Sequence, residues 1–257
     1  ASAVAEHEPN LRPGLAGGLR VPSDSVVYPP AVARHLLERA RALGAEVREG
    51  CRVDAVEPHA VRMGAERLEA QVVVNAAGAE ATRLIPALPI LPRKGHLLIT
   101  DRYPGYCRHQ IVELGYLKSA HEMGSGESVA FNVQPRATGQ LLIGSSRELA
   151  GWERAVNREV LRKMLQRAVH FLPGLAGLST VRSWTGFRPA TPDKLPYVGR
   201  WEEVPGLWMA AGHEGLGITT SLGTAKLLAG LVVGREPAIE AAPFDPARVL
   251  ASATEGA

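Results

Sequence analysis

The sequence predicts a mixed α/β fold in which parallel strands near both ends of the chain flank an antiparallel insert. Two continuous apolar runs, at residues 72–74 and 207–211, each lead into a turn of small residues, as strands of a buried parallel sheet do. Between them, residues 91–150 hold three strand-like segments joined by short turns, which is typical of antiparallel pairing. Because ligands commonly bind at the carboxyl ends of parallel strands, we expect a site where the two apolar runs end.

The first third of the chain predicts a helix followed by short strands. Apolar side chains recur at helical spacing over residues 31–43. Pro30 stands near the expected start of this helix and Gly44 directly after its end, the places that these residues favour. Residues 46–56 alternate loosely between polar and apolar and predict one or two short strands, and residues 68–74 predict another.

The insert predicts a sheet with one helix. Its strands are expected at residues 95–100, 128–134, 140–145 and 181–187. An amphipathic helix is expected over residues 157–171, where Pro173 and Gly174 stop it. Residues 188–193 then form a turn made rigid by two prolines.

These elements divide the chain into three expected parts. Residues 1–90 and 188–257 belong to one α/β domain, and residues 91–187 form the antiparallel domain inserted into it. Residues 1–21 are rich in glycine and proline and are expected to be irregular, as is the tail after Glu236.

A glycine-rich turn at residues 212–217 joins the apolar strand at residues 207–211 to a helix expected over residues 218–233. Glycines let the backbone approach a ligand closely, and we expect Gly217 to need a backbone conformation that favours glycine. The helix start offers free N–H groups and a partial positive charge, which suits a phosphate or the O2/N1 edge of a flavin. The hydroxyls of Thr219, Thr220 and Ser221 are expected to cap this helix start. A plain turn without a ligand fits the same pattern.

Composition excludes several classes of function. The net charge is +3 with scattered arginines, so we expect no nucleic-acid partner. No apolar run reaches the ~18 residues of a membrane span, and the helix at residues 218–233 contains Lys226 and is expected to be buried in protein. Cys51 and Cys107 form no disulfide framework and are typical of a reducing compartment, so we expect a cytoplasmic protein. No cluster of His, Cys, Asp and Glu has metal-ligand spacing, so no metal is expected.

Four stretches in the expected order carry a resemblance to a known family. They read VVNAAG at residues 73–78, WTGFRPATPD at 184–193, LPYVG at 195–199 and AGHEGLG at 211–217. Together they resemble the D-amino acid oxidase superfamily of FAD-dependent oxidoreductases, which includes glycine and sarcosine oxidases and flavin subunits of D-amino acid, opine and hydroxyproline dehydrogenases. The resemblance implies a partial Rossmann-like FAD-binding domain with parallel strands and a substrate domain with an antiparallel sheet.

The resemblance also implies roles for single residues. The backbone N–H groups of Gly215, Leu216, Gly217, Ile218 and Thr219 would bind the flavin O2/N1 edge, and Gly212 would open that loop. Ala76, Ala77 and Gly78 would pack near the cofactor, or would only let a helix approach a strand. The backbone of Val53 would meet the adenine, unless Val53 is an ordinary core residue. His213 would lie near the flavin or, as we prefer, hold the loop in place.

Three residues are candidates for the substrate site. The resemblance implies that Arg188 grips the substrate carboxylate, and the alternative is a surface arginine. Tyr116 and Tyr197 would line the substrate pocket, although tyrosines at strand ends more often pack in a core. In this family the substrate would be an amino acid or secondary amine of the glycine, sarcosine, D-amino acid, D-hydroxyproline or opine class. The hydrogen on its Cα would pass as a hydride to the flavin, and either oxygen or another electron acceptor would then reoxidise the flavin.

One element of the family pattern is not found in this sequence. Members open with a strand, a G-x-G-x-x-G turn and a helix that hold the FAD pyrophosphate, and residues 14–18 have the wrong spacing for this turn. We therefore expect a missing N-terminal segment or a second subunit that supplies it. The alternative function is a non-catalytic fragment or structural subunit that does not bind FAD alone.

Overall fold

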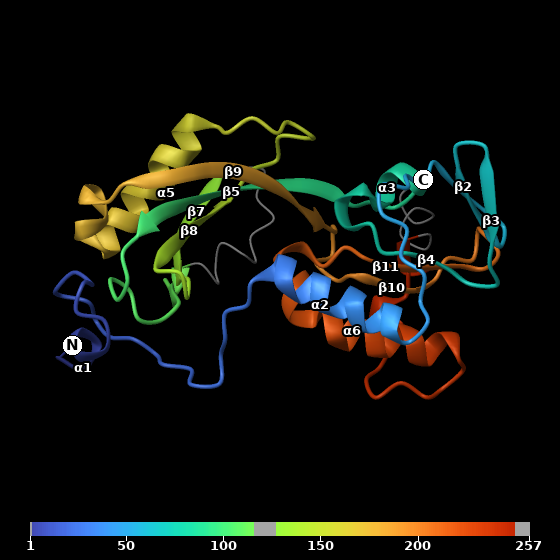
Figure 1. The fold of residues 1–257 in the computed structure, drawn as a ribbon, viewed down its shortest axis with the longest axis horizontal. Helices are drawn as coiled ribbons and strands as arrows, with labels where there is room; N and C mark the ends of the chain where they lie inside the picture. The colour runs from blue at the N-terminus through green and yellow to red at the C-terminus, as the bar shows by residue number, and fades with distance from the viewer. Residues whose placement is uncertain (1, 116–126, 250–257) are drawn as a thin grey trace. The chain divides into compact units, whose positions relative to one another are not determined.

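The computed structural model describes residues 2–115 and 127–249, and the chain divides into two compact units (Figure 1). Unit 1 combines residues 1–27 with residues 93–187, and unit 2 combines residues 28–92 with residues 188–257. The first 27 residues thus group with the antiparallel sheet, whereas the sequence placed them with the rest of residues 1–90.

Unit 1 is built on a five-stranded sheet with the strand order β6-β7-β8-β5-β9. Its strands are β5 (Leu91–Arg102), β6 (Ile111–Val112), β7 (Ser128–Pro135), β8 (Gln140–Arg147) and β9 (Thr180–Ala190). β7 and β8 are antiparallel, with Val133 opposite Ile143, and β8 pairs with β5 in the same sense. The four strands that the sequence predicts in the insert are confirmed, and each is longer than its apolar pattern.

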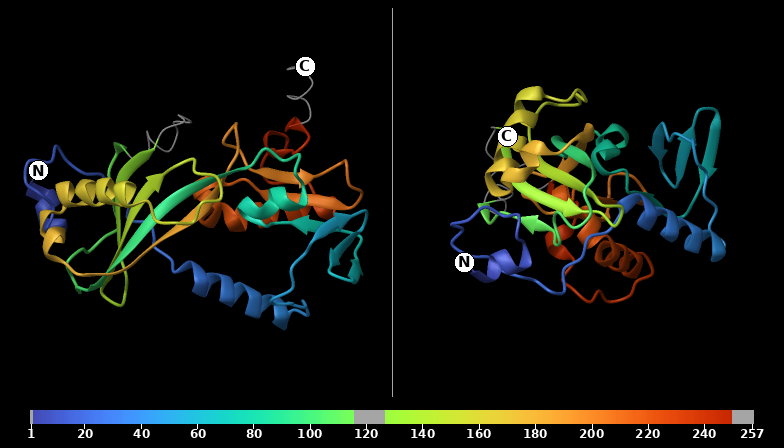
Figure 2. Two further views of the ribbon diagram at one scale, coloured as in Figure 1. Left: turned by 90° about the horizontal axis from the view of Figure 1, so that it is seen from above. Right: turned by 60° about the vertical axis from the view of Figure 1, so that its left-hand side comes forward.

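Helix α5 (Arg158–Phe171) packs on β7 and β8 (Figure 2). Val160, Met164 and Ala168 are its buried residues, and they recur at helical spacing. The side chain of Asn157 caps the helix, because its Oδ1 accepts hydrogen bonds from the amides of Glu159 at 3.1 Å and Val160 at 3.3 Å. The short 3-10 helix η2 (Pro173–Gly177) follows at the predicted stop. The amphipathic helix of the insert is therefore confirmed.

The start of unit 1 contains a helix that the sequence did not predict, α1 (Ser2–His7). Glu8 follows it and is 5 % exposed. The Glu8 carboxylate accepts hydrogen bonds from the amides of Arg108 at 3.0 Å and His109 at 2.6 Å. Contacts across about a hundred residues hold this segment, and local sequence patterns do not contain them.

Unit 2 contains a three-stranded sheet with the order β10-β11-β4. Its strands are β4 (Val73–Asn75), β10 (Tyr197–Arg200) and β11 (Leu207–Ala211). β11 runs parallel to β4, with Leu207 opposite Val73, and antiparallel to β10. The parallel pair is as predicted, whereas β10 was not predicted. The buried core next to this sheet includes Tyr197, Trp201 and Met209 together with residues from 85–90. The short helices η1 (Gly78–Glu80) and α3 (Ala81–Leu84) follow β4.

A second, antiparallel sheet in unit 2 consists of β1 (Ala55–Glu57), β2 (Ala60–Met63) and β3 (Glu66–Glu69). The strands predicted over residues 46–56 exist only at β1. The strand predicted over residues 68–74 was wrong as one element, because the chain changes sheets there. The Ala70 amide still bonds to the His59 carbonyl, whereas the Val73 amide bonds to the Gly206 carbonyl.

The two long helices of unit 2 expose apolar side chains. Helix α2 (Pro29–Ala42) matches the prediction, but it has no buried residue. Helix α6 (Gly217–Val232) buries only Leu227 and Leu228 and leaves Leu222 69 % exposed, so its predicted burial was wrong within the described residues. Length and composition alone would let the segment Glu214–Val232 cross a membrane, contrary to the sequence expectation, but the core helix of a soluble protein passes the same test. The short η4 (Ala242–Phe244) lies in the tail.

The uncovered surface of unit 2 predicts self-association. In the described residues β4 has a sheet neighbour on one side only, and Val74 within β4 is 44 % exposed. An open strand edge next to exposed apolar side chains invites pairing with another chain. We expect the purified chain to elute in gel filtration with light scattering as dimers or larger species. The double variant Val74→Lys, Leu36→Lys, which also changes a 43 % exposed side chain of α2, should shift it toward monomer, whereas Leu149→Lys in a loop of unit 1 should not. A stable wild-type monomer would contradict this.

Candidate functional site

Two turns lie at the carboxyl ends of neighbouring strands in the unit 2 sheet. Because β4 and β11 are parallel, the turn at residues 76–78 and the turn that begins at Gly212 leave from the same end of the sheet. Asn75, 3 % exposed, braces the first turn: its Nδ2 donates to the Ala81 carbonyl and its Oδ1 accepts from the Ala77 amide, both at 3.2 Å. The side chains of Ala76 and Ala77 are small, and Gly78 has a positive φ of 59°, so little side-chain volume covers the backbone of this turn.

We call residues 212–217 the glycine loop. Gly212 begins it with a φ of 89°, and a Cβ there would lie 2.6 Å from Thr191 Cγ2. Glu214 also has a positive φ, 46°, and opens the single 3-10 turn η3 (Glu214–Leu216). The Gly215 amide donates to the carboxylate of Glu214, and the Leu216 amide donates to the His213 carbonyl at 3.0 Å. Two of the five predicted N–H donors are therefore used inside the loop.

The start of α6 has no side-chain cap. The Thr220 hydroxyl donates to the Leu216 carbonyl at 2.9 Å and the Ser221 hydroxyl to the Ile218 carbonyl at 2.8 Å. The predicted hydroxyl cap was therefore wrong, since both residues lie inside the helix and reach back along it. The other three predicted donors, Gly217, Ile218 and Thr219, form the first helical turn, where N–H groups have no intrahelical partner.

Gly217 itself has ordinary helical backbone angles, with φ at −56° and ψ at −36°. The expectation that it needs a conformation reserved for glycine was wrong. A Cβ at this position would lie 3.4 Å from the Cβ of His213, a tight but not prohibitive contact. The conformational and steric need for glycine belongs to Gly212.

Arg188 lies beside the glycine loop. It stands near the end of β9 and is half-buried, and both it and the loop belong to unit 2. A Cβ on Gly215 would lie 3.7 Å from Arg188 Cδ and 3.8 Å from its Nε. The arginine side chain thus passes beside Gly215, in the turn that leads into the uncapped start of α6. This juxtaposition suits a ligand with an anionic group and an electron-rich ring edge.

His213 fastens the loop to α6. Its Nε2 lies 2.9 Å from the hydroxyl of Thr224, and burial lowers the pKa of its imidazole. The contact agrees with the structural role that the sequence favoured, and the neutral ring adds no charge to the site.

The lowered pKa of His213 predicts a pH dependence of stability. Because the unfolded chain takes up this proton first, near its ordinary pKa of about 6.5, the contribution of His213 is present above that pH. It is lost as the pH falls toward the lower folded-state pKa. We expect urea unfolding to show a smaller loss of stability in His213→Gln than in the wild type between about pH 7 and pH 5. Identical slopes in the wild type and in His213→Gln would contradict the prediction.

Val53 does not lie in a strand pair as predicted: it precedes β1, and the Asp54 amide next to it bonds to the Arg62 carbonyl at 2.8 Å. Tyr197 packs in the core of unit 2, where it is 1 % exposed, so it does not line a pocket. Tyr116 lies outside the described residues. Sequence reasoning missed Thr191, which is 1 % exposed and packs on Gly212; its place in the WTGFRPATPD stretch was the available signal.

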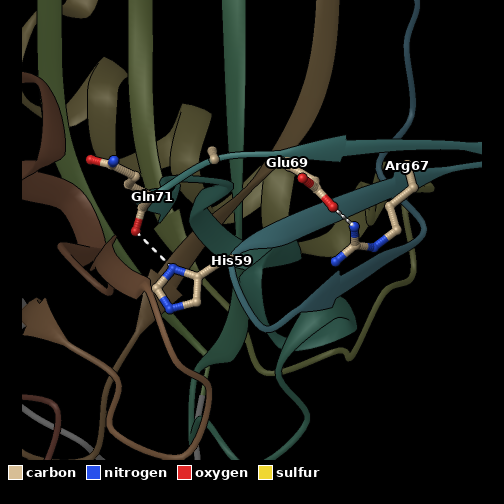
Figure 3. Close-up of a pocket in the computed structure, with 5 residues that line it drawn as sticks. His59, Arg67, Glu69 and Gln71 are labelled. Carbon is tan, nitrogen blue, oxygen red and sulfur yellow. Dashed lines mark hydrogen bonds and ion pairs between the residues drawn. The ribbon is translucent and has the colours of Figure 1, made fainter.

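A shallow hollow of about 400 Å³ lies elsewhere in unit 2, lined by His59, Arg67, Glu69, Ala70 and Gln71 (Figure 3). His59 Nδ1 is 3.1 Å from the Gln71 carbonyl, and Arg67 forms ion pairs with Glu57 and Glu69. Its charges are already satisfied, and none of the predicted site residues lines it. We therefore take the glycine loop, not this hollow, as the candidate site.

Comparison with known proteins decides the family. The model of the family described as FAD dependent oxidoreductase, DAO, matches residues 1–231. The chain belongs to this family. The assignment confirms the predicted family, its α/β fold class, its FAD cofactor and the oxidoreductase class of its enzymes.

Glycine oxidases are among the similar proteins. The glycine oxidase of Pseudomonas aeruginosa is 28% identical over 253 residues, which cover 91% of this chain and 64% of that protein. The bifunctional protein ThiO/ThiG of Nostoc is 31% identical over 237 residues, covering 90% of this chain and 34% of that protein. The structure of glycine oxidase from Geobacillus kaustophilus superposes with a TM-score of 0.82 at 30% identity, covering 95% of this chain and 64% of that one. The chain thus spans less than two thirds of these family members.

Proposed function

We propose that this chain forms the flavin-ring and substrate-binding part of an FAD-dependent oxidoreductase that oxidises the Cα–N bond of an amino acid or secondary amine. The observation that carries the proposal is Arg188 lying over Gly215, beside the uncapped first turn of α6. The similarity to glycine oxidases supports the amino acid class.

The residues present fit a flavin. Small residues at 76–78 and the glycine loop leave the backbone accessible, and the first turn of α6 presents N–H groups with a partial positive charge. Such donors stabilise negative charge that develops at an electron-rich edge. FAD, when bound, would supply the acceptor for a hydride, which carries both electrons of the oxidation.

The protein's own contribution is binding and orientation. Arg188 pairs with the substrate carboxylate through two parallel N–H···O bonds, which fixes the direction of the Cα–H bond. The substrate amine reacts in its neutral form, so the protein need not supply a strong base. We include glycine, sarcosine, D-amino acids, D-hydroxyproline and opines in the substrate class, and oxygen or another electron acceptor as the final oxidant. Tyr116 remains a candidate for the substrate pocket, and Val53 for the adenine contact.

A non-catalytic role is the second candidate function. Helix α2 buries no residue, and the chain spans 64% of a glycine oxidase, so FAD binding by this chain alone would lack some of the contacts of those proteins. In that case the chain acts as a structural subunit, and the nucleotide half of FAD is held by another segment or subunit.

Titration with two flavins separates the two functions. FMN carries the flavin ring without the adenine half, so we expect the purified chain to bind FMN and FAD with similar affinity, read as quenching of flavin fluorescence. Markedly tighter binding of FAD would assign adenine contacts to this chain as well. Binding of neither flavin would favour the non-catalytic role.

A further inference from the structure

The turn that follows Arg188 lies against the glycine loop, and we call residues 189–196 the proline turn. Thr191, inside this turn, fills the space beside Gly212, and its hydroxyl donates to the Leu195 carbonyl at 2.9 Å. The Leu195 amide donates to Asp193 Oδ1 at 3.1 Å. Pro189 and Pro192 restrict the backbone on both sides of Thr191. The turn therefore behaves as one rigid piece between Arg188 and the loop.

A single arginine from the C-terminal segment holds this turn. Arg248 Nε lies 2.6 Å from Asp193 Oδ2, and its Nη2 donates to the Leu195 carbonyl at 2.7 Å. The same guanidinium lies 4.2 Å from the ring centroid of Tyr197, a residue 1 % exposed at the start of β10. The Arg248 side chain is 20 % exposed. Stacking and hydrogen bonding together fix it more firmly than an exposed ion pair is fixed.

The Asp193 carboxylate stays charged for this contact. Burial by itself would raise the pKa of Asp193, but the hydrogen bonds from Arg248 and the Leu195 amide outweigh it and lower the pKa below its usual range. The C-terminal segment also packs against β10, because a Cβ on Gly199 would lie 2.9 Å from Pro246 Cδ. The clamp thus joins three parts of unit 2: the tail, the proline turn and β10.

We propose that Arg248 is a positioning residue: by clamping Asp193 it holds the proline turn against Gly212 and so sets Arg188 in place beside the glycine loop. The inference rests on the proposed function for its catalytic meaning. Its mechanical part, that Arg248 controls the order of the loop, stands on the contacts above alone.

Hydrogen exchange of the purified chain tests the mechanical part. In Arg248→Ala we expect amides of the glycine loop to exchange about tenfold faster, with β11 and unit 1 unchanged. Arg248→Lys keeps the charge but not the planar guanidinium, so its exchange rates should lie between those of the wild type and those of Arg248→Ala. Asp193→Asn should reproduce the effect from the other side of the pair. Arg200→Ala is the matched control, since Arg200 pairs with Glu202 at 3.5 Å on the exposed end of β10.

A second readout connects the clamp to function. In flavin-loaded protein, Arg248→Ala should lower kcat/KM for an amino acid more than for the amine that lacks its carboxylate, because Arg188 is displaced. Faster exchange confined to residues 242–249, or spread evenly over unit 2, would overturn the proposal, since Arg248 would then only anchor the tail or the fold. If no variant and no wild-type protein binds flavin, the proposed function fails, and the exchange result still decides the clamp.

Discussion

Arg188→Ala is expected to lower kcat/KM for an amino acid substrate by roughly 30-fold to several-thousand-fold in flavin-loaded protein, the equivalent of about 2–5 kcal/mol. The physical reason is the loss of the proposed bidentate pair between the half-buried guanidinium and the substrate carboxylate. With Arg188 next to Gly215, this pair would form beside the turn that leads into α6. Steady-state kinetics with glycine, sarcosine and D-alanine measure the loss.

The controls for this variant separate a carboxylate clamp from a structural arginine. Methylamine, dimethylamine and ethylamine lack the carboxylates of the three substrates, and their turnover should change little. Arg188→Lys should fall between the wild type and Arg188→Ala, because it keeps the charge but not the planar fork. Arg182→Ala, on the same strand and 5.5 Å from the Trp184 ring, should retain activity. Equal losses with amino acids and amines would remove Arg188 from the role of clamp.

Gly212→Ala is expected to lower the free energy of unfolding of unit 2 by roughly 2–5 kcal/mol, the sum of a left-handed backbone penalty and overpacking. The φ of 89° disfavours any side chain, and the new Cβ would lie 2.6 Å from Thr191 Cγ2. The proline turn or the glycine loop must then move. We expect lower stability in urea denaturation and a much weaker affinity for FMN.

Gly217→Ala is the matched control for Gly212→Ala. Its φ of −56° suits alanine, and a Cβ would meet His213 Cβ at 3.4 Å. Alanine also favours a helix more than glycine does. We expect a change in stability below about 1 kcal/mol. If both variants lose stability equally, the special geometry assigned to Gly212 is wrong.

Local patterns predicted the long elements well. Helices α2, α5 and α6 and strand β11 match their expected ranges within a few residues, because apolar spacing and terminal residues define each of them. What failed depended on distant contacts. Helix α1 is followed by Glu8, which is bonded to residues about a hundred positions away, and β10 exists because it pairs with β11.

In the candidate site too, local patterns predicted some features and failed for those that depend on three-dimensional contacts. The glycine loop was found from its strand, glycines and helix, and its neighbour Arg188 from a resemblance of the surrounding stretch. The roles of Thr220, Ser221 and Gly217 were wrong because hydroxyl direction and backbone angle are not visible in a sequence. The pairing of Arg248 with Asp193 joins residues 55 positions apart, and no local pattern indicates it.

Anaerobic mixing of the flavin-loaded chain with substrate tests the central claim most directly. We expect glycine, sarcosine or D-alanine to bleach the visible absorption of the bound flavin, because the amino acid reduces the flavin. The matching amines should bleach it far more slowly. A chain that binds flavin, yet whose absorption no amino acid of the proposed class bleaches, would contradict the assignment of this site to amino acid oxidation.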